Sequence, residues 1–123
     1  MTFPGMPCVF YGDEKGAEGV EENDYRQAMP WKRENGSLFE LYKELIALRN
    51  RERALRKGSF VVEGITEKGV YIYSRKTEDV SIRVTINRTK DFYFGKMENI
   101  IAERGYGNGR LMPYGFVIER EEI

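Results

Sequence analysis

Residues 4–14 read PGMPCVFYGDE, and this stretch predicts the architecture of the first part of the chain. The segment 8–11 is an apolar run of strand length that a Gly-Asp pair ends, so we predict a strand over residues 7–11. An apolar strand without alternation is typical of a sheet covered on both faces, such as a parallel barrel strand flanked by helices. Cys8 lies inside the run and is expected to be a buried structural thiol. Because the chain has no βαβ units that would supply parallel neighbours, we interpret it as the tail of something larger.

A helix is predicted over residues 38–56. Ser37 and Glu40 form a Ser-x-x-Glu capping box, whose side chains would satisfy orphan N–H groups of the first turn. The apolar positions fall largely on one stripe at helical spacing and are Leu38, Leu41, Tyr42, Leu45, Leu48 and Leu55. Gly58 marks the C-terminal stop. The stripe indicates a helix that packs on one face.

After the helix the apolar pattern changes to that of strands. The strongest signal lies at residues 80–87, where four β-branched residues alternate with polar ones, so one face of this strand is expected in the core and the other in water. Further strands are predicted at 60–62, 70–73, 91–95, 97–103 and 115–120. Asn108-Gly109 is a good turn pair between the last two strands. Regularly spaced strands without helices predict an antiparallel β-sandwich.

Composition argues against several classes of partner. Lys plus Arg equals Asp plus Glu at 20 each, so no overall field favours nucleic acid or an anionic membrane surface. No apolar run approaches the roughly 20 residues needed to cross a bilayer, and the N-terminus lacks the pattern of a secretory signal. One cysteine forbids an internal disulfide. We therefore expect a cytoplasmic protein without a nucleic-acid or membrane partner.

Four segments match one protein family in the same order along the chain. They are residues 4–14, 19–31 (GVEENDYRQAMPW), 38–57 (LFELYKELIALRNRERALRK) and 111–116 (LMPYGF). Together they resemble the α-amylase family of glycoside hydrolases, especially its cyclomaltodextrinase, neopullulanase and maltogenic amylase branch. In that family a Pro-Gly-x-Pro-x-x-Tyr-Tyr-Gly-Asp-Glu segment forms the eighth strand of a (β/α)8 barrel. The third segment is similar to the eighth barrel helix, and the fourth to the last strand of the C-terminal sandwich.

The resemblance implies a mainly β chain, in which a C-terminal antiparallel β-sandwich follows a remnant (last strand and last helix) of a (β/α)8 barrel. We expect residues 1–57 to be the remnant and residues 58–123 to be the sandwich domain. The implied parent enzyme acts on α-glucosidic bonds of maltodextrins, cyclodextrins or pullulan. The family's catalytic acids lie upstream of the eighth strand. We therefore expect no catalytic residue, metal or cofactor here, and no activity from the chain alone.

The loop 21–26 is the best candidate for contact with sugar, because (β/α)8 enzymes build their sites from loops at the C-terminal ends of the strands. In many members of the family an Asp and an Arg four residues apart hydrogen-bond glucose units. Arg26 aligns with that Arg, Glu22 stands where Asp is usual, and Asn23 replaces a Pro. We predict Glu22 and Arg26 as substrate-binding residues of an intact enzyme. The alternative is a solvated loop in which Arg26 makes a surface ion pair worth under about 1 kcal/mol.

Two other candidates are interpreted as structural. Asp13 and Glu14 are adjacent, so their side chains point roughly opposite ways and cannot face each other across one glycosidic bond. Trp31 follows a Met-Pro pair and is interpreted as a plug that packs its loop onto the barrel.

Two further functions stay open beside the glycosidase. One is a glycan-binding module with an aromatic platform drawn from Tyr71, Tyr73, Phe92, Tyr93 and Phe94. The other is an interaction fragment that complements a separately encoded barrel half. An apolar strand without neighbours also tends to pair with another chain. The expected partners are thus an α-glucan, a missing barrel half, or a second copy bound through strand 7–11 and helix 38–56.

Overall fold

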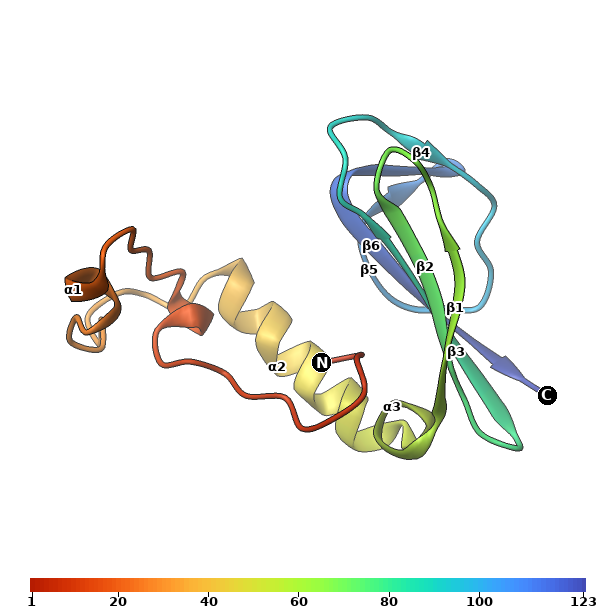
Figure 1. Ribbon diagram of the computed structural model, residues 1–123, viewed down its shortest axis with the longest axis horizontal. Coiled ribbons are helices and arrows are strands. Elements are labelled where there is room, and N and C mark those ends of the chain that lie inside the picture. The colour runs from red at the N-terminus through yellow and green to blue at the C-terminus, as the bar shows by residue number, and fades with distance from the viewer.

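The computed structural model describes residues 1–123, except for the side chain of Tyr25. An N-terminal segment and short helices lead into one antiparallel sheet (Figure 1). The helices are η1 (Asp13–Lys15), α1 (Glu22–Tyr25), α2 (Ser37–Arg51) and α3 (Arg53–Lys57). The strands are β1 (Ser59–Ile65), β2 (Val70–Lys76), β3 (Val80–Asn87), β4 (Tyr93–Phe94), β5 (Ile100–Gly107) and β6 (Arg110–Glu122). In Figure 1, α2 extends away from the sheet and α3 lies at one end of it.

The N-terminal arm, residues 1–11, does not form the strand predicted at 7–11. It runs back along α2 (Figure 1), and the sheet contains no strand paired with it. The prediction was wrong because a strand needs a neighbour for its backbone N–H and C=O groups, and apolarity alone does not supply one. Cys8, predicted to be buried, is exposed for the same reason. Phe10 beside it is 53% exposed.

The single helix predicted over 38–56 is two helices that meet at Glu52. Its backbone is extended (φ −86°, ψ 108°), although its N–H still donates to the carbonyl oxygen of Leu48 at 2.9 Å. The break turns α3 so that Ala54 and Leu55 are buried against the sheet, while α2 leads away from it. Periodicity could not show the break, because both halves keep helical spacing.

The capping box predicted at Ser37 is also wrong. The helix α2 begins at Ser37 itself, after Gly36, and no side chain caps it. The Glu40 carboxylate pairs instead with Lys43 at 3.2 Å. A capping side chain must belong to the residue before the first helical one, so a shift of one position removes the box.

The sheet folds over at β6, and this gives the β-sandwich. Its order is β1-β2-β3-β6-β4, with β5 also paired to β6. Residues 116–122 of β6 pair with β3, residues 110–111 pair with β4, and β5 pairs with parts of both halves. Between the halves Tyr114 has φ +58°, where the strand bends and changes neighbours. The bend builds two layers from one antiparallel sheet.

The predicted strand positions and the turn are confirmed. Each strand predicted after residue 58 overlaps an observed strand. Asn108 and Gly109 connect β5 to β6 with φ +51° and +71°. A two-residue hairpin turn of this kind needs positive φ at both positions, and Asn and Gly tolerate it best.

The main core lies between α3 and the sheet. It consists of Leu48, Ala54, Leu55, Tyr73, Ile82, Val84, Ala102 and Ile118. The alternation predicted for β3 is confirmed at Ile82 and Val84, and Arg83 on the other face is exposed. That other face is not wet throughout, because Thr85 and Asn87 are 2% and 0% exposed. The folded-over part of β6 covers them, and Asn87 donates hydrogen bonds to its carbonyl groups.

Two buried arginines anchor the arm, and the first is Arg49 of α2. Its guanidinium donates to the carbonyl oxygens of Met1 at 2.6 Å, Phe3 at 3.0 Å and Gly5 at 2.5 Å. Arg49 is only 8% exposed, although it lies in the last turn of α2. Hydrogen bonds to charged donors contribute about 1.5–3 kcal/mol each, so this residue fixes the start of the arm on α2.

The second anchoring residue is Arg75 of β2, which is 2% exposed. Its guanidinium donates to the carbonyl oxygens of Thr2 at 3.0 Å, Leu55 at 2.9 Å and Gly58 at 2.9 Å. Burial, followed by the nearby charge of Arg49, lowers the pKa of Arg75 from its usual value. One side chain thus joins the arm, the end of α3 and the sheet.

Candidate functional site

The two predicted sugar-binding residues lie together at α1. Arg26 Nη2 is 2.5 Å from Glu22 Oε1. Their spacing of four residues places both side chains on one side of the helical turn. The side chains of Arg26 and Glu22 are 75% and 77% exposed, so both charged groups are accessible from solvent.

A capping box that the sequence analysis missed starts α1. The Glu21 side chain accepts the backbone N–H of Asp24. The Asp24 carboxylate in turn accepts the N–H groups of Val20 at 3.0 Å and Glu21 at 3.1 Å. These bonds lower the pKa of Asp24 because they favour its ionised form. The sequence pattern that could have indicated this capping box is Glu-x-x-Asp at residues 21–24, a variant of the usual Ser/Thr-x-x-Glu pattern.

Replacing Arg26 by alanine is expected to change the free energy of unfolding by less than about 0.5 kcal/mol. An exposed pair at this spacing contributes only about 0.3–0.5 kcal/mol. Urea unfolding of both proteins, followed by circular dichroism, measures the difference. A loss above about 1 kcal/mol would mean that Arg26 holds the loop together and is not available to bind a ligand.

Asp13 and Glu14 form η1 and do not face each other as a catalytic pair. One Glu14 carboxylate oxygen accepts the N–H of Gly12 at 3.1 Å and so closes the turn locally. The η1 turn packs on α2. There burial, followed by the charges of Asp13 and Glu14, raises the pKa of Tyr42. The acidic pair is thus built into the contact between η1 and α2.

An apolar groove of about 460 Å³ lies between the arm and α2. Side chains from both contribute to it, among them Pro7, Val9, Leu38, Leu41 and Leu45. Met6 at its edge is 95% exposed, and Leu38 is 40% exposed. Part of the helical apolar stripe therefore faces the arm, and part of it stays open to solvent.

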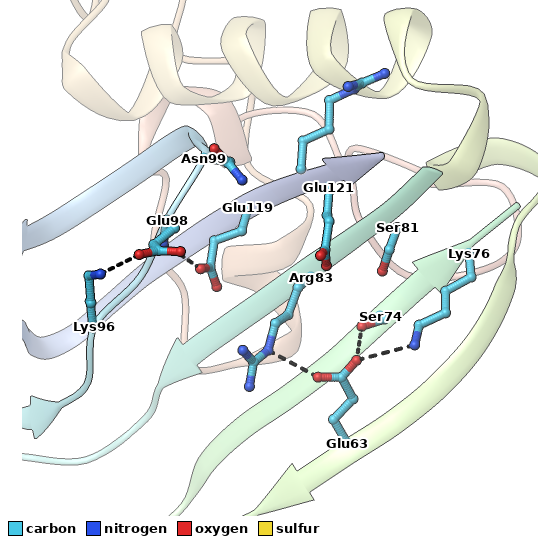
Figure 2. A pocket seen from close by; sticks show the side chains of 11 residues that line it. Glu63, Ser74, Lys76, Ser81, Arg83, Lys96, Glu98, Asn99, Glu119 and Glu121 are labelled. Carbon is cyan, nitrogen blue, oxygen red and sulfur yellow. Dashed lines mark hydrogen bonds and ion pairs between the residues drawn. The ribbon is translucent and has the colours of Figure 1, made fainter. Parts of the chain in front are cut away.

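A polar hollow of about 430 Å³ lies on the face of the sheet opposite α3 (Figure 2). Figure 2 shows Glu63 between two cations, Lys76 at 3.7 Å and Arg83 at 3.0 Å. Lys96 donates a hydrogen bond to the Glu98 carboxylate, and this bond lowers the pKa of Glu98. A general acid needs a raised pKa. Glu63 and Glu98 are therefore paired with cations, and the lowered pKa of Glu98 does not suit it to act as a general acid.

The five predicted platform aromatics do not share one surface. Tyr73 is 3% exposed, and its ring centre lies 5.0 Å from that of Phe3 in the arm. Phe92 and Phe94 are 44% and 72% exposed. Trp31 is 79% exposed, and its packing onto a barrel stays a prediction.

Among the described residues, no three His, Cys, Asp or Glu side chains are grouped so that they could hold a metal ion. No helix in this part of the chain is long and apolar enough to cross a membrane.

Sequence comparison finds relatives among α-glucan-degrading enzymes. No protein-family model matches the chain. The cyclomaltodextrinase of Geobacillus thermopakistaniensis is 35% identical over an alignment 136 positions long, which takes in 96% of this chain and 23% of that enzyme. Neopullulanase 2 of Thermoactinomyces vulgaris is 38% identical over 90 residues, which cover 71% of this chain and 15% of that enzyme. The chain thus spans less than a quarter of the length of these curated relatives.

Solved structures of a maltogenic amylase and of a debranching enzyme share the fold of this chain. The maltogenic amylase from S. marinus matches with a TM-score of 0.72 and 29% identity, over 89% of this chain and 16% of that one. The Nostoc punctiforme debranching enzyme matches with a TM-score of 0.76 and 23% identity, over 95% of this chain and 26% of that one. The predicted resemblance is confirmed: the chain belongs to the α-amylase family of glycoside hydrolases and corresponds to the C-terminal part of such an enzyme.

Proposed function

We propose that the chain completes a glycosidase that acts on α-glucosidic bonds of maltodextrins, cyclodextrins or pullulan, and that it has no activity alone. In this proposal residues 1–57 close the catalytic barrel and residues 58–123 brace it. The supporting observation is the apolar groove between the arm and α2. It is built from the two segments that the resemblance assigns to the last barrel strand and the last barrel helix.

The groove supports docking onto a barrel because its open apolar side chains have no cover of their own. Met6, Val9 and Leu38 line it and are 95%, 37% and 40% exposed. Burying a large apolar side chain contributes about 1.5–3 kcal/mol. A barrel whose final strand position is vacant would cover them and would give the arm the strand neighbour that it lacks here.

The geometry of Asp13 and Glu14 does not support catalysis by this pair. A retaining glycosidase needs two carboxyl groups about 5 Å apart across the bond. Asp13 and Glu14 are adjacent in one turn, and Glu14 is held by the N–H of Gly12. The resemblance places the family's three catalytic acids upstream of the arm.

Glu22 and Arg26 are proposed to contact glucose once the barrel is complete. Their ion pair occupies one carboxylate oxygen and one guanidinium nitrogen. A carboxylate has two oxygens and a guanidinium has five N–H donors, so both groups keep free positions for sugar hydroxyls. The pair would hold the two side chains in place before the sugar arrives.

The test is release of reducing sugar from maltotriose, β-cyclodextrin and pullulan. The purified chain is expected to release none. A mixture with the upstream part of the Geobacillus thermopakistaniensis cyclomaltodextrinase, ending just before the segment that aligns with this chain, is expected to hydrolyse at least one of them. Turnover by the chain alone, surviving repurification, would overturn the proposal.

Two variants of α2 make the test specific to the groove. Leu41→Glu places a charge in the groove and should abolish complementation. Lys43→Glu changes the same helix at an exposed position and should leave it intact. Equal loss in both variants, or in neither, would count against the groove as the docking surface. Size-exclusion chromatography of the chain alone distinguishes the rival outcome, a dimer formed through this same groove.

A further inference from the structure

A second hollow, of about 310 Å³, lies at the end of the sandwich away from α3. Figure 1 shows the β1–β2 turn beside β4 at this end of the sheet. The walls come from that turn and from the connection between β3 and β4, and they include Thr66, Glu67, Lys68, Thr89, Asp91 and Phe92. The arm and the apolar groove contribute nothing to it.

An aromatic surface adjoins the hollow. Phe92 and Phe94 are 44% and 72% exposed, whereas Tyr93 between them is half-buried. Residues two apart in an extended segment point the same way and lie about 7 Å apart. The Arg110 guanidinium carbon lies 5.0 Å from the centre of the Phe92 ring, and Arg110 pairs with Phe94 across the strands. The two rings are therefore displayed side by side on a paired strand edge.

The polar wall is held in place by local hydrogen bonds. The Thr89 hydroxyl donates to Asn87 Oδ1 at 2.8 Å and accepts the N–H of Asp91 at 3.1 Å. Thr66 Oγ1 accepts the N–H of Val70 at 3.0 Å, which leaves its own hydrogen free to donate outwards. These bonds fix the two loops that form the hollow.

The hollow carries charges of both signs. Lys68 Nζ lies 3.6 Å from Asp91 Oδ2, and both side chains are mostly exposed. The charged residues that line it are Glu67, Lys68 and Asp91, and Arg110 lies beside them over the Phe92 ring. A rim with charges of both signs does not select a phosphate, a nucleic acid or a strongly charged peptide. It does offer donors and acceptors together, which a neutral ligand rich in hydroxyl groups can use.

We propose that this hollow and the Phe92–Phe94 surface bind a neutral α-linked glucan chain. A pyranose ring has an apolar C–H face and an edge of hydroxyls. The face would rest on Phe92 or Phe94, and the hydroxyls of a neighbouring unit would meet Lys68 and Asp91. The choice of an α-glucan rests on the proposed function. Because the site lies at the other end of the sandwich from the groove, a barrel docked on the groove leaves it open.

Isothermal titration calorimetry of the full chain with maltoheptaose and with β-cyclodextrin tests the site. Phe92→Ala and Phe94→Ala are each expected to weaken binding about tenfold or more, which corresponds to about 1.4 kcal/mol. Trp31→Ala is the matched control, because Trp31 is also an exposed aromatic, at 79%, but lies outside the hollow. It should leave affinity unchanged. Thermal unfolding of each variant verifies that the fold is kept.

Three results would overturn the site. They are no binding by the full chain, binding that neither phenylalanine variant weakens, and equal binding of cellohexaose, whose linkages are β. Calorimetry needs no catalysis, so the outcome is independent of the complementation assay. Binding without complementation would contradict only the proposed function, and complementation without binding would contradict only the site.

Discussion

Replacing Arg75 by alanine is expected to lower the free energy of unfolding by about 3–5 kcal/mol. The side chain is 2% exposed and donates hydrogen bonds to three carbonyl groups from three parts of the chain. Buried acceptors that lose their donor cost about 1–3 kcal/mol each, and the vacated volume adds a cavity term. Urea unfolding followed by circular dichroism measures the change.

Arg83→Ala is the matched control for this prediction. It makes the same substitution on the adjacent strand, at a side chain that is 47% exposed and paired with Glu63, and should cost under about 1 kcal/mol. Arg75→Lys should recover only part of the loss, because a lysine ammonium lacks the fixed fork of a guanidinium. Similar losses for Arg75→Ala and Arg83→Ala would show that the buried hydrogen bonds are not decisive.

Leu55→Ala is expected to destabilise the fold by about 2–5 kcal/mol. Leu55 is 0% exposed and belongs to the cluster that joins α3 to the sheet. The substitution removes three buried carbon atoms and leaves a cavity that the strands cannot fully close. The same urea unfolding assay, with the slope of the transition unchanged, would show a loss of packing in an otherwise intact fold.

The control for Leu55 is Leu38→Ala, the same chemical change in the uncovered part of the helical stripe. Leu38 is 40% exposed, so little buried area is lost and the expected cost is under about 1 kcal/mol. In a complementation mixture the cost of Leu38→Ala is expected to rise, because docking would bury Leu38. An equal loss at both positions in the free chain would contradict the assignment of the core to α3.

The strands were predictable because their information is local. In β3 the alternation of Ile82 and Val84 with Arg83 follows from the pleat, and the Asn108-Gly109 turn follows from its need for positive φ. Burial of Asn87 was not predictable, since it depends on β6 folding back from far along the chain.

Features that depend on contacts with distant parts of the chain were predicted less well. The segment 7–11 has the composition of a buried strand but no strand beside it here. The break at Glu52 arises because Leu48 and Leu55 both reach the core while α2 leads away, and spacing cannot report a bend of this kind. The buried roles of Arg49 and Arg75 carry no sequence pattern, because their partners are carbonyl groups that every residue has.

In the candidate site, too, local contacts were predictable and contacts with distant parts were not. The approach of Glu22 to Arg26 was predictable from their spacing of four residues. Their contact with glucose stays a prediction, because it depends on the proposed docking of the chain onto a barrel. The hollow beside Phe92 was not predictable at all, since it joins two loops that only the sheet brings together.

The carbonyl bonds of Arg49 and Arg75 also set an order of events during folding. They join Met1 to a residue 48 positions later and Thr2 to one 73 positions later. Closing such long loops is entropically costly and slow compared with forming a helix or a hairpin. We therefore expect the arm to be secured on Arg75 only after β2 has formed. Until then its apolar residues are open to chaperones, proteases and other copies of the chain.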